Sequence, residues 1–324
     1  MSGGIGRVLG ATAHRNGFRV GGVSVHLDSN RSDDVSLAPA LVPFQAQTGA
    51  SDIDIHVEWT EKLSPMTGAQ LFDSGSTWRL YEGEEGFRFD FHAPIFGERP
   101  YRRLLTDGHF SQAVLQMSEG SFARTGYLAA PLAYPLDELL IMHRLTQEKA
   151  IELHGVGIVG PHGASNLFIG HSGAGKSTTA RLWTANHDVQ VLSDDRIIVR
   201  EHRVRDENVR DDELCENQFR EGDTTQIFMY GTPWHGEAAF ALPGRAPLRR
   251  IFILEHGCGN AITRLSRSQM VAELFARSFV PFHRHEYVDS ALSFLERVAD
   301  SVPCYRYAFE PDQRAVERIL NFHD

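Results

Sequence analysis

Residues 167–178 read Leu-Phe-Ile-Gly-His-Ser-Gly-Ala-Gly-Lys-Ser-Thr, and this stretch decides the fold class. Residues 170–177 fit the pattern Gly-x-x-x-x-Gly-Lys-Ser/Thr of a phosphate-binding loop, or P-loop. The apolar residues before the loop predict a strand, and residues 176–186 predict a short helix, which is the context that the pattern requires. We therefore expect an α/β domain that binds the phosphates of a nucleotide.

The residue types of the loop explain how it would bind phosphate. Glycines let successive backbone N–H groups turn towards phosphate oxygens, and the start of the helix adds partial positive charge. Lys176 is expected to reach the β- and γ-phosphates, and the Ser177 hydroxyl to bind Mg²⁺. The nucleotide-binding candidates are Gly170, His171, Ser172, Gly173, Ala174, Gly175, Lys176, Ser177 and Thr178. Because ATPases, GTPases and kinases share this loop, the motif alone leaves the reaction open.

Two aspartates follow the next expected strand, residues 189–192. Asp194 comes only 18 residues after Lys176 and would stand beside the γ-phosphate, where an acceptor hydroxyl gives up its proton. This placement favours a kinase with Asp194 as the base. Side chains alternate along a strand, so Asp195 is expected on the other face, and a simple turn-forming role stays open for both residues. We take Ser177 and Asp195 as the candidate metal ligands.

A histidine interrupts the strand that we expect at residues 151–159. His154 would lie beside the P-loop strand, where it could orient a phosphate or a carboxylate. A hydrogen-bonded histidine in the core explains the same position, because burial is not visible in the sequence. His154 is therefore a candidate catalytic residue, with both interpretations open.

Three segments together resemble a known family. They are His154-Gly155-Val156, Gly170-His171-Ser172-Gly173-Ala174-Gly175-Lys176-Ser177 and Leu192-Ser193-Asp194-Asp195-Arg196. They are similar to the catalytic domain of HPr kinase/phosphorylase, whose P-loop fold is related to that of phosphoenolpyruvate carboxykinase. The resemblance covers mainly residues 151–200 and implies ATP, Mg²⁺ and a serine hydroxyl acceptor. It also implies that Lys176 binds phosphate, Ser177 binds magnesium, Asp194 takes the hydroxyl proton and His154 is the family's strand histidine.

The chain departs from this family at two places. Thr178 stands where the family usually has glutamate, and residues 231–237, Gly-Thr-Pro-Trp-His-Gly-Glu, replace its Gly-Leu-Gly-Ile segment. The replacement resembles a set of uncharacterised HPr-kinase-like proteins, some of which accompany peptide-modifying systems. HPr itself is therefore not expected as the acceptor, and the sequence gives no support for the phosphorylase reaction. The loop could grip the acceptor through Thr232, Trp234 and His235, or it could be a tight turn anchored by a buried tryptophan.

The first part of the chain has a different pattern. Residues 18–27, 53–59, 78–81 and 87–91 alternate or are rich in aromatic residues, which predicts strands, the last two forming a hairpin. Pro135 lies at the expected start of a helix. We predict a β-rich domain at residues 1–130 that helps to recognise the acceptor. An α/β P-loop kinase domain of the HPr kinase/phosphoenolpyruvate carboxykinase type would follow at residues 131–324.

The composition limits the classes of partner that the chain is expected to bind. The 324-residue chain has a net charge of -10, which repels a nucleic-acid backbone. Its three cysteines show no Cys-x-x-Cys spacing, and no stretch is apolar enough for a signal core or a membrane span. We expect a cytoplasmic protein without nucleic-acid or membrane partners, and a homo-oligomer stays open. The acceptor is expected to be a peptide, a protein or a small molecule that carries a hydroxyl group.

Several features and two rival functions stay open. Residues 201–223 hold nine acidic and four basic residues and predict a solvated insertion. Candidates for neutralising charge in the transition state are Arg245, Arg249, Arg250 and Arg277. The sequence favours a kinase that phosphorylates serine on a peptide or small protein. The rivals are a small-molecule P-loop kinase of the shikimate-kinase type and a nucleotide-dependent regulatory protein that transfers no phosphate.

Overall fold

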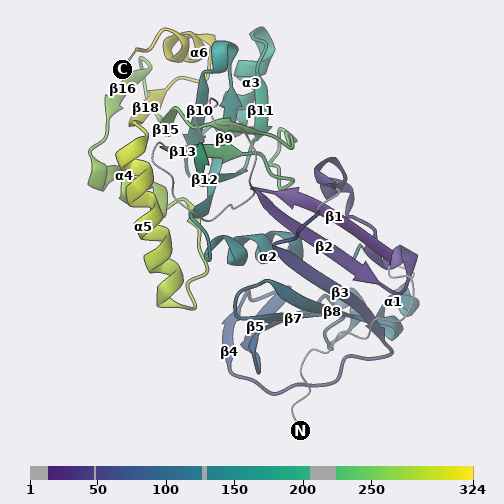
Figure 1. Cartoon of the computed structure of the whole chain (residues 1–324). Coiled ribbons are helices and arrows are strands. Elements are labelled where there is room, and N and C mark those ends of the chain that lie inside the picture. Colours follow the sequence, from purple (N-terminus) through teal and green to yellow (C-terminus); the bar gives the residue numbers. More distant parts are fainter. Residues whose placement is uncertain (1–13, 47–48, 126–129, 205–223, 324) are drawn as a thin grey trace, which may run out of the picture. The chain divides into compact units, whose positions relative to one another are not determined.

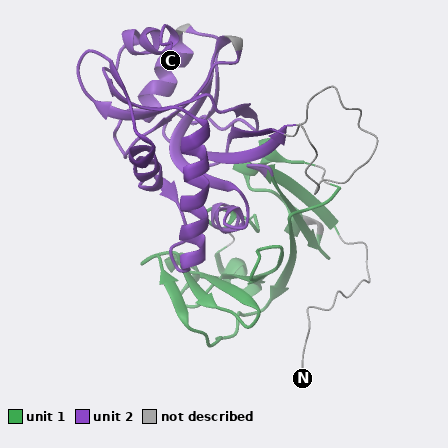
Figure 2. Ribbon diagram, turned by 60° about the vertical axis from the view of Figure 1, so that its left-hand side comes forward, with its two compact units in different colours: residues 1–19, 23–137 green, residues 20–22, 138–324 purple. Residues whose placement is uncertain are grey.

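A computed structural model describes residues 14–46, 49–125, 130–204 and 224–323. The chain divides into two compact units, residues 1–19 with 23–137 and residues 20–22 with 138–324 (Figure 2). The sequence placed a boundary between residues 130 and 131, whereas the two units divide within helix α2 (Leu136–Leu145). Each unit has its own sheet, and the whole is a mixed α/β fold.

The first unit is built on an eight-stranded sheet with the order β1-β2-β3-β8-β7-β6-β5-β4. The strands are β1 (His14–Val20), β2 (Val23–Ser29), β3 (Ile53–Thr60), β4 (Gln70–Asp73), β5 (Trp78–Glu82), β6 (Gly86–Phe91), β7 (Arg102–Asp107) and β8 (Gln112–Ser118), followed by helix α1 (Glu119–Thr125). Strand β3 pairs in parallel with β2 and β8, and β8 to β4 form an antiparallel meander. The expected β-rich character of this region is therefore observed.

Two predictions for this sheet differ in outcome. The hairpin is confirmed, because β5 and β6 pair antiparallel with Trp78 opposite Phe91. The single strand expected at residues 18–27 is wrong, because the chain turns at Gly21 and Gly22 and forms two strands. Both glycines have positive φ angles, 59° and 82°, which side chains with a Cβ atom rarely adopt. The apolar pattern continued across the turn, so only the glycine pair signalled the break.

The second unit is built on a ten-stranded sheet with the order β14-β13-β12-β9-β10-β15-β18-β16, and β11 and β17 pair with β9 (Figure 1). Its strands are β9 (Ala150–Val159), β10 (Ser165–Ile169), β11 (Gln190–Ser193), β12 (Arg196–Val204), β13 (Thr224–Tyr230), β14 (Arg245–Pro247), β15 (Arg250–His256), β16 (Ala261–Arg264), β17 (Ser278–Phe279) and β18 (Cys304–Phe309). Its further helices are α3 (Lys176–Asn186), α4 (Arg267–Phe275), α5 (His285–Ser301) and α6 (Gln313–Leu320). The predicted helix at residues 176–186 is confirmed.

Helices cover both faces of this sheet because its central strands are apolar on both sides. Leu167 and Ile169 of β10 pack in one core with residues of α4 and α5. Phe168, which points the other way, packs in a second core with Trp183 of α3 and Ile319 of α6. The alternation along β10 thus places the P-loop strand in the middle of a three-layer arrangement.

The register of β9 brings the two site-bearing strands to one edge. Strands β10 and β11 are both antiparallel to β9 and lie on opposite sides of it, so they run in the same direction. Ile169, the last residue of β10, lies opposite Gly155, and Ser193, the last residue of β11, lies opposite Gly157. The P-loop and the Asp194-Asp195 pair therefore leave the sheet at neighbouring positions.

Two expectations concern the surface of the chain. Residues 201–204, expected at the start of a solvated insertion, instead continue strand β12, where they pair with β13. The rest of that predicted insertion, residues 205–223, lies outside the described residues. Within the part of the chain that the structure describes, no helix has the length and apolarity to cross a membrane.

Candidate active site

The P-loop connects β10 to α3, and two of its glycines stand where a Cβ atom would come too close to a neighbouring side chain. A Cβ atom on Gly175 would lie 2.5 Å from the ring of Phe309, and Gly175 also has a φ of 100°. A Cβ atom on Gly170 would lie 2.7 Å from the Cβ atom of Ala174. The sequence pattern and the backbone geometry therefore agree on why glycine occupies these positions.

Lys176 lies inside the curve of this loop. Its side chain is largely buried, and its Nζ donates hydrogen bonds to the carbonyl oxygens of Gly170 at 3.1 Å and His171 at 3.0 Å. Burial lowers the pKa of Lys176, and the carboxylate of Asp195 is the main group that opposes this change. The ammonium group is thus held at the site where the motif predicts phosphate binding.

The other nucleotide-binding candidates line the same loop with different exposure. His171, Ser172 and Gly173 are exposed, Ala174 is buried, and Thr178 is half-buried on the first turn of α3. The exposed part of the loop therefore spans residues 171–173.

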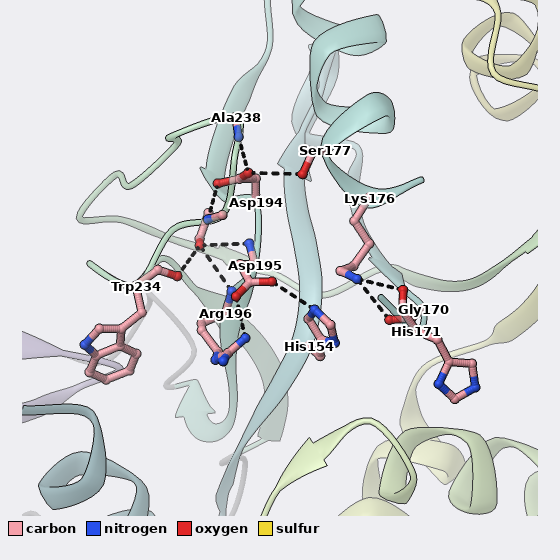
Figure 3. Close-up of polar contacts among 12 residues, drawn as sticks. His154, Gly170, His171, Lys176, Ser177, Asp194, Asp195, Arg196, Trp234 and Ala238 are labelled. Carbon is pink, nitrogen blue, oxygen red and sulfur yellow. Dashed lines mark hydrogen bonds and ion pairs between the residues drawn. The ribbon is translucent and has the colours of Figure 1, made fainter. Parts of the chain in front are cut away.

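Asp194 is held mainly by the backbone of one loop. Its carboxylate is buried and accepts hydrogen bonds from the backbone N–H groups of Gly236 at 3.0 Å, Ala238 at 2.8 Å and Phe240 at 3.2 Å. The Ser177 hydroxyl lies 3.4 Å from Asp194 Oδ2 (Figure 3). Asp194 therefore connects the P-loop serine to the end of the predicted acceptor loop and to the residues directly after it.

Asp195 points towards a different set of partners (Figure 3). Its Oδ1 lies 2.9 Å from His154 Nε2, and its Oδ2 accepts a hydrogen bond from Arg196. Burial alone would raise the pKa of Asp195, but the hydrogen bond from His154 and the charges of Arg196 and Lys176 outweigh it and hold that pKa below its usual value. His154 is thus half-buried and paired with a carboxylate rather than enclosed in an apolar core.

Two glutamates lie behind Arg196. Its Nε donates to Glu138 at 2.8 Å and lies 3.3 Å from Glu152 Oε1, and its guanidinium stacks over the Phe279 ring at 4.0 Å. Glu152 is completely buried, and this burial, together with the neighbouring charge of Glu138, raises its pKa well above the usual value. A neutral, protonated Glu152 is the form that such a site favours.

The three acceptor-loop candidates have different environments. The Thr232 hydroxyl is buried and donates to the carbonyl oxygen of Arg196 at 2.8 Å. Trp234 is also buried, and its carbonyl oxygen lies 3.5 Å from the Ser193 hydroxyl. His235 is exposed. Thr232 and Trp234 thus hold the loop in place, and His235 is the candidate that solvent, and so an acceptor, can reach.

Of the two predicted metal ligands, Ser177 is better placed than Asp195 to bind a magnesium ion. Ser177 Oγ and Asp194 Oδ2 form a pair of neighbouring oxygen atoms, and Mg²⁺ typically takes one or two protein oxygens beside phosphate and water. The oxygens of Asp195 instead face His154 and Arg196. Among the described residues, no group of three or more His, Cys, Asp or Glu side chains could hold a metal. A metal at Ser177 would therefore depend on the nucleotide phosphates for most of its ligands.

Sequence reasoning missed the backbone groups that hold Asp194 and the glutamate that lies beside Arg196. The N–H groups around Asp194 belong to the backbone, which carries no residue-specific signal, although a Cβ atom on Gly236 would lie 3.0 Å from Asp194 Oδ2. Glu152 lies in an apolar strand and was not singled out. Its position two residues before His154 was the available signal, because residues two apart in a strand lie on the same face.

Comparison with known proteins adds no further information. No protein-family model matches the chain, and a search of curated proteins finds no significant relative.

Proposed function

We propose that this chain is an ATP-dependent kinase that transfers the γ-phosphoryl group to a hydroxyl acceptor, in the first place a serine of a peptide or small protein. One observation carries the proposal: the P-loop lysine and two carboxylates with separate partners lie at one edge of the sheet. Phosphoryl transfer needs these three elements, namely a phosphate cradle, an oxygen ligand for the metal and a proton acceptor.

The contacts lead us to exchange the roles that the sequence suggested for the aspartates. Asp194 neighbours Ser177 and already accepts three backbone hydrogen bonds, so it suits the metal side of the site. Asp195 is oriented by His154 and has the stronger influence on Lys176, which supports Asp195 as the proton acceptor. Its low pKa keeps it ionised at neutral pH, so that positioning matters more than basicity.

The residues of the chain then have defined tasks. The loop N–H groups and Lys176 bind the β- and γ-phosphates, and the acceptor oxygen attacks the γ-phosphorus in line with the bond to ADP. Asp195 takes the hydroxyl proton, while His154 and Arg196 hold its carboxylate in place. Mg²⁺, when bound at Ser177 and Asp194, supplies charge that offsets the negative charge on the phosphates.

A transfer assay with labelled nucleotide tests the proposal. The protein would be incubated with γ-³²P-ATP, Mg²⁺ and a library of peptides that each carry one serine, with a set of small-molecule alcohols as a second arm. Label on a peptide supports the proposal, and label only on a small alcohol favours the small-molecule kinase. ATP binding without transfer or hydrolysis would favour the regulatory protein.

Two lysine variants serve as the matched pair for this assay. Lys176→Ala removes the buried ammonium of the P-loop and is expected to abolish transfer and weaken ATP binding. Lys149→Ala removes an exposed ammonium that pairs with Glu201 away from the loop and is expected to leave both unchanged. Equal activity in the two variants would contradict the assignment of the P-loop.

A further inference from the structure

The four arginines that the sequence singled out have different surroundings. Arg245 contacts the Tyr230 hydroxyl at 3.3 Å, and Arg250 lies over the ring of Phe322 at 5.5 Å. Arg249 is exposed. Arg277 instead contacts the P-loop. Its Nη2 donates a hydrogen bond to His171 Nε2 at 2.9 Å.

The structure holds Arg277 firmly in this position. The residue is 7% exposed, and its backbone carbonyl accepts a hydrogen bond from the N–H of His154 at 2.8 Å. Its Nη1 donates to the side chain and to the carbonyl oxygen of Glu273, one turn back in α4. Arg277 thus connects the end of α4, the strand of His154 and the loop that cradles phosphate.

In the described part of the chain, the Arg277 guanidinium group retains one N–H group that is free to bind a further acceptor. Its Nε is buried and has no hydrogen-bond partner among the described residues. Glu273, its acidic partner, also lies 3.2 Å from Arg306, which has a second carboxylate partner in Glu255 at 2.8 Å. After the larger effect of burial, the charge of Arg277 contributes to the lowered pKa of Lys176. Two buried cations that face one loop favour an anion between them.

We propose that Arg277 is a catalytic residue that contacts the γ-phosphate of bound ATP, a role that rests on the function proposed above. In the reaction the bond between the γ-phosphorus and the bridging oxygen breaks, and the electron pair stays on ADP. The acceptor oxygen forms the new bond, and its proton passes to Asp195. Arg277 then stabilises negative charge on the transferring group, as arginines do in other phosphoryl-transfer sites.

The test compares ATP with ADP and needs no knowledge of the acceptor. Calorimetry in the presence of Mg²⁺ would give dissociation constants of both nucleotides for the wild type, Arg277→Ala and Arg277→Gln. Loss of a charge-assisted contact to the γ-phosphate is expected to reduce the preference for ATP over ADP by about 10- to 100-fold in both variants. Glutamine keeps a donor towards His171, so a purely structural role would be rescued by Arg277→Gln.

A nearby arginine is the control. Arg267 begins α4 and pairs with Asp300 at the surface, so Arg267→Ala should leave the nucleotide preference unchanged. Thermal unfolding of each variant shows whether it folds. If Arg277→Ala does not fold, the nucleotide preference of Arg277→Gln tests the inference. An ATP-to-ADP preference equal to that of the wild type in Arg277→Gln overturns the inference and leaves the kinase proposal standing. A wild type that binds neither nucleotide overturns the kinase proposal itself.

Discussion

Asp194 and Asp195 are adjacent in the sequence but belong to two different regions of the site. The Asp194 region is made of backbone, since three N–H groups of residues 236–240 converge on its carboxylate. The Asp195 region is made of charged side chains, in which His154 and Arg196 contact the carboxylate and the buried Glu152 lies behind them. One region depends on the path of a loop, and the other depends on the identity of individual residues.

This difference indicates which role each carboxylate can take in the reaction. A carboxylate with several backbone donors is fixed in orientation, and carboxylates that bind metals are typically held by hydrogen bonds in this way. A carboxylate among ionisable side chains can exchange a proton and respond to its neighbours. The four substitutions below separate the two regions, beginning with the largest expected effect.

Asp195→Asn should abolish transfer while leaving ATP binding nearly unchanged. Asparagine keeps an oxygen for His154 or Arg196 but cannot accept the hydroxyl proton, and loss of a general base typically costs about 10²- to 10⁴-fold in rate. The rate of transfer and the ATP dissociation constant are the two measurements. Asp300→Asn, at an exposed ion pair, is the control. Undiminished transfer by Asp195→Asn would remove Asp195 from the mechanism and return the role to Asp194.

Asp194→Asn should affect stability and magnesium dependence together. The new amide group would bring donors against the N–H groups of Gly236, Ala238 and Phe240, and a buried donor without a partner costs about 1–3 kcal/mol. Urea unfolding measures the stability, and ATP titrations at several Mg²⁺ concentrations measure the metal requirement. If the variant keeps wild-type magnesium dependence but loses transfer, the roles that we assign to the two aspartates must be exchanged.

Glu152→Gln should change how stability depends on pH. The pKa of Glu152 is raised in the folded state, so above the unfolded pKa of about 4.3 the folded protein keeps a proton that the unfolded chain releases. Wild-type stability therefore falls as pH rises towards the folded pKa, by about 1.4 kcal/mol per pH unit from this group alone.

Glutamine resembles the protonated form and has no such dependence. The difference in unfolding free energy between variant and wild type should therefore shift in favour of Glu152→Gln from about pH 4.3 upward. Urea unfolding at several pH values measures this difference. A difference that stays constant over this range would show that Glu152 is ionised in the folded protein.

Gly236→Ala should have the smallest effect. The added Cβ atom would lie 3.0 Å from Asp194 Oδ2 and 3.3 Å from the Cβ atom of Asp195, so the loop must shift slightly. Overpacking of this kind costs about 1 kcal/mol at the lower end of its range. Gly49→Ala, where a Cβ atom meets nothing within 4 Å, is the control for thermal unfolding and ATP affinity. Identical behaviour of the two variants would show that the loop does not position Asp194.

Much of the fold around the P-loop could be predicted from local pattern. The helix at residues 176–186 was predicted with its observed ends, because the motif fixes where the helix begins. The strand that carries His154 was predicted because apolar residues run on both sides of it. The turn at Gly21 and Gly22 was missed, since the apolar pattern continues across it and only backbone conformation breaks the strand.

The sequence by itself determined the P-loop, the strand before it and the presence of two aspartates near its lysine. Only the tertiary structure decided what each aspartate faces. The backbone donors to Asp194 lie more than 40 residues away in the chain, and His154, which pairs with Asp195, lies on strand β9. The same holds for Arg277, which reaches His171 across 106 residues of sequence. Local patterns record the conformational preferences of short segments, whereas contacts between distant segments exist only after the sheet has brought them together.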